Sequence, residues 1–168
     1  MLRRILLLVV ALALAAAGGR SLLEDAAPAK RSKARLERVV DGDTLVVRVG
    51  DREERVRLIG IDTPESVKPG APVECGGKAA SRAMRRLVKG ADAVRLITDP
   101  TQDRRDRYDR LLRYVELPDG TDLGRAQVRA GWADVYVYDG HPFRRVKGYR
   151  AAERRAEQEG RGIHGRCD

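Results

Sequence analysis

The sequence lacks the features of a membrane-spanning or repeat protein. Its longest apolar run, Ile5 to Ala17, has 13 residues, whereas a membrane-spanning helix needs about 17 to 25. No cysteine stands directly after this run, which argues against attachment to a lipid. The chain also has no internal repeat and no low-complexity region, which excludes a repeat architecture.

The first 17 residues instead have the layout of a secretory signal peptide. Arg3 and Arg4 precede the apolar run, and small residues follow it up to a suitable cleavage point after Ala17. We therefore predict an exported protein, with residues 18–33 as a flexible leader and residues 34–168 as one folded domain. The alternative is an uncleaved signal anchor, and only in that case do we expect association with a membrane.

Cysteine is scarce, with Cys75 and Cys167 as the two examples in the chain. In an exported protein an even number of cysteines suggests a disulfide. Closing a loop of roughly 90 residues would contribute on the order of 4 kcal/mol in the chain-entropy description. Two free buried thiols are the alternative.

The formal net charge is +9, from 34 Lys and Arg against 25 Asp and Glu. The basic residues are mostly Arg and occur along the whole domain rather than in a terminal tail. This excess suits a polyanionic partner such as nucleic acid, but a soluble surface without such a partner explains it equally well. Composition alone does not decide between the two.

Hydrophobic patterning predicts an α+β domain. Residues 34–61 hold three strand-like runs that are separated by turn signals. Two further strands and three helices are expected later in the chain, the strands at 93–97 and 111–117 and the helices at 77–89, 122–130 and 142–159. This order favours a small five-stranded barrel, closed or partly open.

Oxygen-bearing side chains gather in the segments VDGDTL and RLIGIDTPE. Asp41 is expected to serve the Asp-Gly turn, whereas Asp43 opens the next strand and can face a cleft. Asp43, Asp62 and the backbone carbonyl of Thr63 would supply three oxygen ligands to a hard cation such as Ca²⁺. Glu65 could then act as a general base or position a water molecule. Taken singly, each acid could equally be a solvated turn residue or an ion-pair partner.

Arginine and tyrosine complete the candidate site. Arg57 and Arg110 each offer a planar fork of donors, and together they could stabilise the charge that develops on a phosphoryl group. Arg107 and Tyr108 lie in the same charged segment as Arg110, for which a solvated basic loop is the alternative. In VYVY, two tyrosines alternate on one face, either to stack on bases or as half-buried core residues: Tyr136 and Tyr138.

Strict alternation along a strand would put Arg57 and Asp62, five residues apart, on opposite faces. If both serve one site, the chain must bend or bulge between them, and Gly60 is the natural place. The two histidines, His141 and His164, lie beside expected helix ends and far in sequence from the acids, so we interpret both as structural.

Taken together, these segments resemble the thermonuclease family, the staphylococcal nuclease-like proteins. The resemblance rests on DGDT, RLIGIDTPE, DRYDR and VYVY in this order and spans about Ala34 to Gly165. It implies a five-stranded Greek-key β-barrel of the OB type with three helices. It also implies a monomeric, Ca²⁺-dependent enzyme that hydrolyses phosphodiesters of DNA and RNA and leaves 3′-phosphate and 5′-hydroxyl ends.

By position, the resemblance assigns Asp43, Asp62 and the Thr63 carbonyl to calcium, and Glu65 to the attacking water. It assigns the phosphate contacts to Arg57 and Arg110. It assigns the remaining nucleotide contacts to Arg107, Tyr108, Tyr136 and Tyr138. Pairing of Cys75 with Cys167 also fits exported members of the family.

Two positions depart from the family pattern. Asp109 stands where a glycine is usual; aspartate tolerates the left-handed conformation, but its charge near the phosphate would weaken binding. His164 stands where a tryptophan is usual, which affects local packing rather than chemistry. Two other functions stay open: the same barrel could bind nucleic acid without cutting it, or serve as an exported structural or adhesion domain.

Overall fold

The computed structural model describes residues 28–66 and 73–167. The predicted signal peptide and residues 18–27 of the predicted leader lie outside the described residues. The first strand, β1, spans Arg31–Val39. Its residues 31–33 pair in the sheet with Ile97, Leu96 and Arg95. The prediction of a flexible leader over residues 18–33 is therefore wrong for residues 31–33. Within the described residues, no helix is long and apolar enough to cross a membrane.

Five strands close into a barrel in the order β1-β2-β3-β6-β5, with β5 returning to β1. The other four strands are β2 (Thr44–Val49), β3 (Arg52–Leu58), β5 (Ala93–Ile97) and β6 (Leu111–Glu116). Only the β3–β6 pairing is parallel within this barrel, and the other pairings are antiparallel. The predicted α+β fold with a five-stranded OB-type barrel is confirmed, and the barrel is closed.

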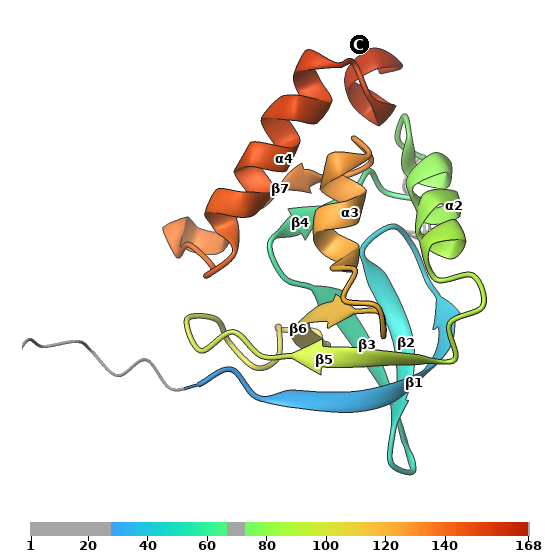
Figure 1. Ribbon diagram of the computed structural model, residues 1–168, viewed down its shortest axis with the longest axis vertical. Coiled ribbons are helices and arrows are strands. Elements are labelled where there is room, and N and C mark those ends of the chain that lie inside the picture. The colour runs from blue at the N-terminus through green and yellow to red at the C-terminus, as the bar shows by residue number, and fades with distance from the viewer. Residues whose placement is uncertain (1–27, 67–72, 168) are drawn as a thin grey trace, which may run out of the picture.

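Three α-helices lie over one end of the barrel, with α3 between α2 and α4 (Figure 1). Their bounds are α2 (Gly77–Leu87), α3 (Leu123–Arg129) and α4 (Val146–Gln158). A second, two-stranded sheet pairs β4 (Ile61–Asp62) with β7 (Asp134–Val135). Two 3-10 turns complete the structure, η1 (Tyr138–Gly140) and η2 (Gly162–Gly165).

Helix α4 begins at Val146, not at Pro142 as the sequence suggested. The residues between them are held outside the helix by specific contacts. Phe143 is buried in the core, and the backbone N–H of Arg144 donates to Asp99 Oδ2 over 2.7 Å. The N–H of Arg145 donates to the Tyr114 hydroxyl over 3.3 Å. These contacts join segments far apart in the sequence, so no local pattern could predict them.

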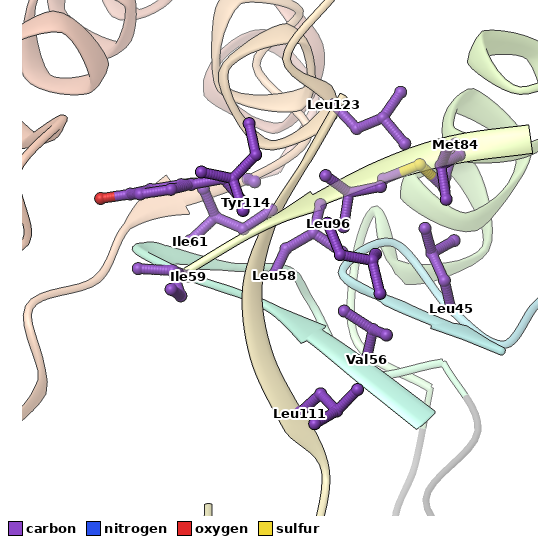
Figure 2. Packing of buried hydrophobic residues seen from close by; sticks show 14 of the residues in the cluster. Leu45, Val56, Leu58, Ile59, Ile61, Met84, Leu96, Leu111, Tyr114 and Leu123 are labelled. Atoms are coloured by element: carbon purple, nitrogen blue, oxygen red, sulfur yellow. The ribbon is translucent and has the colours of Figure 1, made fainter. Parts of the chain in front are cut away.

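The core fills the barrel and extends under the helices. Figure 2 shows Leu45, Val56, Leu58, Leu96 and Leu111 meeting in the barrel, all of them buried. Each buried aliphatic side chain stabilises the fold by roughly 1.5–3 kcal/mol, which exceeds what an exposed ion pair contributes. The core therefore sets the positions of the strand ends from which the polar residues project.

Gly60 provides the bend predicted between Arg57 and Asp62. Strand β3 ends at Leu58, Gly60 adopts φ +80°, and β4 starts at Ile61. A Cβ atom at Gly60 would lie 2.3 Å from Phe143 Cζ, so both the backbone angle and the packing require glycine here.

Cys75 and Cys167 form a disulfide with an Sγ–Sγ distance of 2.05 Å. The expected pairing is confirmed, and the alternative of two free thiols is wrong. The bond ties the segment before α2 to the end of the described chain after η2.

Candidate active site

One cleft collects the predicted site residues in two neighbouring lobes. The first, which we call the acidic lobe, has a volume of about 420 Å³ and is lined by Asp41, Asp43, Arg57, Asp62, Thr63, Pro64, Glu65, Tyr108 and Arg110. The second, the aromatic lobe, has a volume of about 600 Å³ and includes Arg107, Tyr136 and Tyr138 in its lining. Arg57, Asp62, Tyr108 and Arg110 line both lobes, so the two form one continuous cleft.

Asp43 is fixed at the floor of the acidic lobe, 5% exposed. Its Oδ2 accepts hydrogen bonds from the backbone N–H and the hydroxyl of Thr63, over 3.1 and 3.0 Å. Its Oδ1 accepts from the Thr44 hydroxyl over 2.9 Å. Asp41 Oδ1 accepts from the N–H of Asp43 over 3.0 Å, which confirms the turn role expected of Asp41 and tightens the loop before β2.

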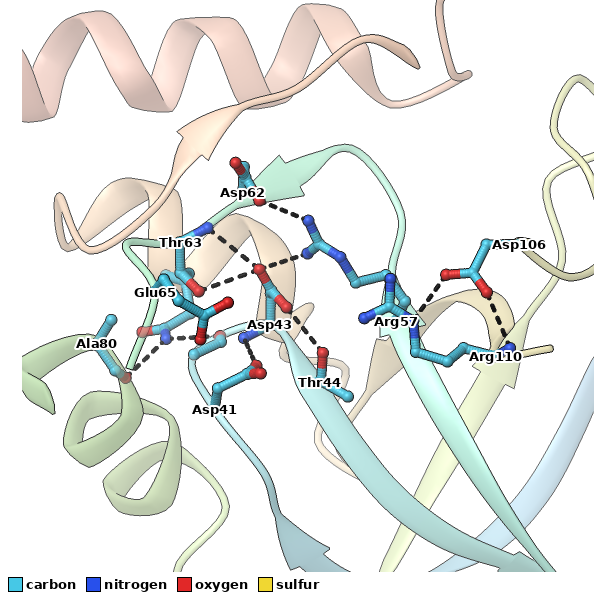
Figure 3. Close-up of polar contacts among 12 residues, drawn as sticks. Asp41, Asp43, Thr44, Arg57, Asp62, Thr63, Glu65, Ala80, Asp106 and Arg110 are labelled. Atoms are coloured by element: carbon cyan, nitrogen blue, oxygen red, sulfur yellow. Dashed lines mark hydrogen bonds and ion pairs between the residues drawn. The ribbon is translucent and has the colours of Figure 1, made fainter. Parts of the chain in front are cut away.

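Arg57 bridges the two aspartates that were predicted to hold metal. Its Nη1 lies 2.5 Å from Asp43 Oδ2, and its Nη2 lies 2.7 Å from Asp62 Oδ1. Figure 3 shows the guanidinium between the two carboxylates, with the Arg110 side chain on the same side of the cleft. The bend at Gly60 thus brings the two ends of RLIGIDTPE together.

The acidic lobe has an excess of negative charge despite this arginine. Burial and the charge of Asp43 raise the pKa of Asp41 to about 6. Burial is also the main cause that raises the pKa of Asp62, and the attraction of Arg57 only partly offsets it. Both shifts mean that the ionised carboxylates are less stable here than in water, mainly because burial removes their hydration.

The predicted cation ligands can form only an open site in the negatively charged acidic lobe. Among residues 28–66 and 73–167, no three or more His, Cys, Asp and Glu side chains converge as a metal cluster. The expected set has two carboxylates, Asp43 and Asp62, and the backbone carbonyl of Thr63. All are hard oxygen donors, so they suit a cation that keeps most of its remaining places for water and substrate.

Glu65 lines the same lobe, and its backbone is held by a residue that the sequence did not single out. The N–H of Glu65 donates to Glu74 Oε2 over 2.8 Å, and its carbonyl accepts from the N–H of Glu74 over 3.0 Å. The start of α2 packs on this segment so closely that a Cβ at Gly77 would lie 2.5 Å from the Glu65 carbonyl oxygen. Glu74 and Gly77 therefore position Glu65.

Asp106 organises the loop that carries Arg110. Its Oδ1 accepts from the N–H groups of Tyr108 and Arg110, over 2.9 and 3.0 Å, and its Oδ2 accepts from Arg110 Nε over 2.7 Å. Burial alone would raise the pKa of Asp106, but the hydrogen bonds from Arg110 and Tyr108 outweigh it and hold the pKa below its ordinary value. The sequence hypothesis overlooked this residue, although an aspartate at the start of a turn is its usual signal.

Asp109 adopts the left-handed conformation, with φ +62°, as predicted for an aspartate in place of glycine. Its carbonyl accepts from Arg105 Nη1 over 2.6 Å, and its carboxylate lies 3.5 Å from the same nitrogen. Arg105 therefore offsets part of the negative charge that Asp109 brings to the loop.

The aromatic lobe is open to solvent. Tyr108, Tyr136 and Tyr138 are 64%, 47% and 63% exposed, so the interpretation of Tyr136 and Tyr138 as core residues is wrong. Their two rings lie 6.5 Å apart. The guanidinium of Arg107 lies 4.8 Å from the centre of the Tyr108 ring, and its Nη2 donates to the Tyr108 hydroxyl over 2.7 Å. These exposed rings present faces on which bases could stack.

Gln127, on α3, is a buried residue that sequence reasoning missed. Its Nε2 donates to the carbonyls of Gly42 and Ala80, over 2.9 and 3.0 Å. These bonds tie the loop before Asp43 to both α2 and α3. The sequence does not indicate what this glutamine binds, because Gly42 lies 85 residues away along the chain.

The comparisons with known proteins agree with this arrangement. The family described as Staphylococcal nuclease homologue matches residues 55–165. A thermonuclease of Staphylococcus intermedius is 46% identical over 84 residues, which cover 50% of this chain and 48% of that protein. Endonuclease YncB of Bacillus subtilis is 39% identical over 105 residues, covering 62% and 48%.

A protein of Escherichia coli named uncharacterized endonuclease matches over a larger share, with 35% identity across 135 residues that cover 80% of this chain and 78% of the relative. By contrast, the chain spans about half the length of the thermonuclease and of YncB. Because the family match extends over most of the folded domain and includes Arg57, Asp62, Glu65 and Arg110, the chain belongs to the family of staphylococcal nuclease homologues.

Proposed function

We propose that this protein is an endonuclease that hydrolyses phosphodiester bonds of DNA and RNA. The observation that carries the proposal is the acidic lobe, where three acids and two guanidinium groups line one hollow: Asp43, Asp62, Glu65, Arg57 and Arg110. The names of the relatives, thermonuclease and endonuclease, support the same reaction. A domain that only binds nucleic acid, or a structural domain, has no use for this combination.

In this proposal the arginines hold the phosphate and the glutamate handles the water. Arg110 and Arg57 donate to the phosphoryl oxygens and stabilise the charge that grows as the water oxygen attacks phosphorus. Glu65 accepts the proton of that water. The bond from phosphorus to the 5′-oxygen breaks, and the departing oxygen takes up a proton from solvent, which leaves a 3′-phosphate on one fragment and a 5′-hydroxyl on the other.

Asp43, Asp62 and the Thr63 carbonyl would hold a divalent cation, which we propose to be Ca²⁺ because all three are oxygen donors at an open site. The bound ion would supply positive charge next to the phosphate. Arg57, which pairs with both aspartates, keeps the two carboxylates close together in its absence.

The aromatic lobe would bind the nucleotides next to the cleaved bond. Tyr136 and Tyr138 offer exposed rings for stacking. Tyr108 lines both lobes, and the Arg107 guanidinium lies over its ring. We also propose that the protein is exported and acts as a monomer. The disulfide between Cys75 and Cys167 supports an oxidising compartment.

The direct test incubates the purified protein with single-stranded DNA and with RNA, first with Ca²⁺ and then with a chelator. We expect internal cleavage with Ca²⁺, fragments that carry 3′-phosphates, and no cleavage with the chelator. Binding without cleavage in both conditions would favour the binding-module alternative. Neither binding nor cleavage would favour a structural domain.

The variant Glu65→Gln sharpens this test. Removing the base should lower kcat by about 10²- to 10⁴-fold, while the melting temperature stays close to that of the unchanged protein. Glu53→Gln, at an exposed position of β3, is the matched control and should keep full activity. Full activity of Glu65→Gln would remove this residue from the reaction.

A further inference from the structure

Helix α2 differs from the rest of the surface because its charged side chains are all positive. Between Gly77 and Gly90 the chain contains five basic residues and no acidic one. At 100° per residue, the four basic residues within α2 project from one face of the helix, and Lys89 follows in the turn after its last residue. We call this set the α2 basic stripe: Lys78, Arg82, Arg85, Arg86 and Lys89. All are exposed, whereas Ala80 and Met84 on the opposite face are buried.

Elsewhere many surface arginines have acidic partners. Arg38 pairs with Glu53 over 3.2 Å, Arg105 with Glu54 over 3.0 Å, and Arg150 with Glu153 over 2.8 Å. Within the part of the chain that the structure describes, no residue of the α2 basic stripe forms an ion pair. Like charges three and four residues apart on a helix repel one another, and a bound polyanion would relieve this repulsion.

The stripe starts beside the acidic lobe. The first turn of α2 packs on the Glu65 carbonyl at Gly77, and the Ser81 hydroxyl lies 3.0 Å from that of Ser66. Gln127 ties Ala80 to the loop of Gly42. Figure 3 shows the helix that carries Ala80 next to the segment of Thr63 and Glu65. A helix of this length extends for roughly 16 Å, which continues the site along the surface.

We propose that the α2 basic stripe binds the phosphates of a single-stranded nucleic acid beyond the nucleotides held in the cleft. The inference rests on the proposed function, because it extends the substrate of the same site to a longer strand. Phosphate contacts of this kind are independent of sequence and sensitive to salt. An anionic membrane suits the stripe less well, since a helix that binds a bilayer needs a free apolar face, and that of α2 is buried against the core.

The test compares two triple variants that remove the same charge. The first is Arg82→Gln, Arg85→Gln and Arg86→Gln in the α2 basic stripe. The control is Lys147→Gln, Arg154→Gln and Arg155→Gln on α4, where all three side chains are exposed and which lies on the other side of α3 (Figure 1). Binding of labelled single-stranded DNA of about 20 nucleotides, longer than the roughly 4–16 that an OB fold covers, is measured by anisotropy in chelator over a range of salt.

Each phosphate contact adds about 0.7 to the slope of log affinity against log salt for a single strand. The α2 triple variant should therefore lower that slope by about 2 and weaken binding by about 10- to 100-fold near 0.1 M salt. The α4 control should change binding by less than about 3-fold. Thermal melting should show the α2 variant to be about as stable as the unchanged protein, because the repulsion that is removed offsets the lost attraction of Arg85 and Arg86 to the C-terminal end of the helix.

Cleavage of a dinucleotide with Ca²⁺ separates this inference from the proposed function. The α2 variant should cleave the dinucleotide like the unchanged protein, since no phosphate reaches the stripe. If neither the unchanged protein nor any variant cleaves any substrate, the proposed function fails. The comparison of DNA binding in chelator still tests whether the α2 basic stripe binds phosphates. Equal losses of DNA binding in both triple variants, or no loss in either, would overturn the inference. So would an α2 variant that binds phosphatidylserine vesicles less tightly but binds DNA as before.

Discussion

The two lobes of the cleft are built in opposite ways. In the acidic lobe, Asp43 is buried, accepts hydrogen bonds from Thr63 and Thr44, and forms an ion pair with Arg57. In the aromatic lobe, Tyr138 and its neighbours are exposed. Groups locked in place can stabilise a transition state without rearranging, whereas exposed rings can adjust to different bases. The acidic lobe should therefore govern the chemical step, and the aromatic lobe the affinity for substrate.

The two lobes also differ in the elements and residues that hold them in place. The acidic lobe lies where β2, β4, α2 and α3 meet, and Gln127 and Glu74 hold its loops from behind. The aromatic lobe draws on the 106–110 loop and on the segment after β7. Arg110 lines both lobes, which makes it the most informative position for separating their roles.

The largest effect is expected for Arg110→Lys. Lysine keeps the charge but loses the planar fork that can hold two phosphoryl oxygens, so kcat should fall by about 10³-fold or more. Arg107→Lys, in the same loop but exposed, is the control and should change kcat by less than about 5-fold. Steady-state kinetics on single-stranded DNA with Ca²⁺ would measure both, and equal effects would contradict the division between the lobes.

Gln127→Leu tests the support of the acidic lobe. It leaves the buried carbonyls of Gly42 and Ala80 without their donor, which should destabilise the fold by about 2–4 kcal/mol. It should also raise the Ca²⁺ concentration needed for half-maximal cleavage, because the loop before Asp43 loosens. Both effects can be read from urea unfolding and from a calcium titration of activity.

Gln102→Leu is the matched control for that change. Gln102 also donates to two carbonyls, those of Thr101 and His141, over 3.0 and 3.1 Å, but at an exposed site. Water can replace these bonds, so the loss should be under about 1 kcal/mol. Similar losses for both glutamines would mean that burial near the acidic lobe is not what matters.

A smaller and different effect is expected in the aromatic lobe. Tyr138→Leu should raise KM by about 10-fold through lost stacking, with kcat changed only slightly and stability unaltered. Tyr138→Phe keeps the ring and should retain most of the affinity. If Tyr138→Leu lowered kcat instead of raising KM, the two lobes would not be functionally distinct.

The sequence predicted best what depends on local backbone geometry. The bend at Gly60 and the left-handed conformation at Asp109 follow from what those residues allow, and the barrel follows from alternating strands. The grouping of Asp43 and Asp62 is predicted from the sequence, but their shared ion pair with Arg57 is not, because it requires the bend at Gly60 to turn β4 back toward the end of β3.

The residues that support the site were not predicted, for a physical reason. Gln127 and the late start of α4 depend on contacts between segments distant in the chain. The strands β4 and β7 have two residues each, too few for a periodic pattern. Glu74 reads as one more charged loop residue until its two bonds to Glu65 are seen.

The smallest effect is expected for Asp106→Asn, which probes the loop shared by the two lobes. Asparagine can keep the oxygen that accepts from the N–H groups of Tyr108 and Arg110, but it loses the charge that faces Arg110 Nε. Near neutral pH this should destabilise the protein by about 1 kcal/mol. Arg110 would also be less fixed, so kcat should fall by a few-fold while KM changes little.

The pH dependence identifies the cause of that loss. The pKa of Asp106 is lowered in the folded protein, so its contribution to stability is fully present above its ordinary pKa of about 3.9 and is lost as pH falls through the lower folded value. The stability difference between the unchanged protein and Asp106→Asn should be constant above about pH 5 and shrink below about pH 4. Urea unfolding across this range measures it. A difference that persisted undiminished at pH 3 would show that the carboxylate charge does not hold Arg110, and that the loop is fixed by its backbone alone.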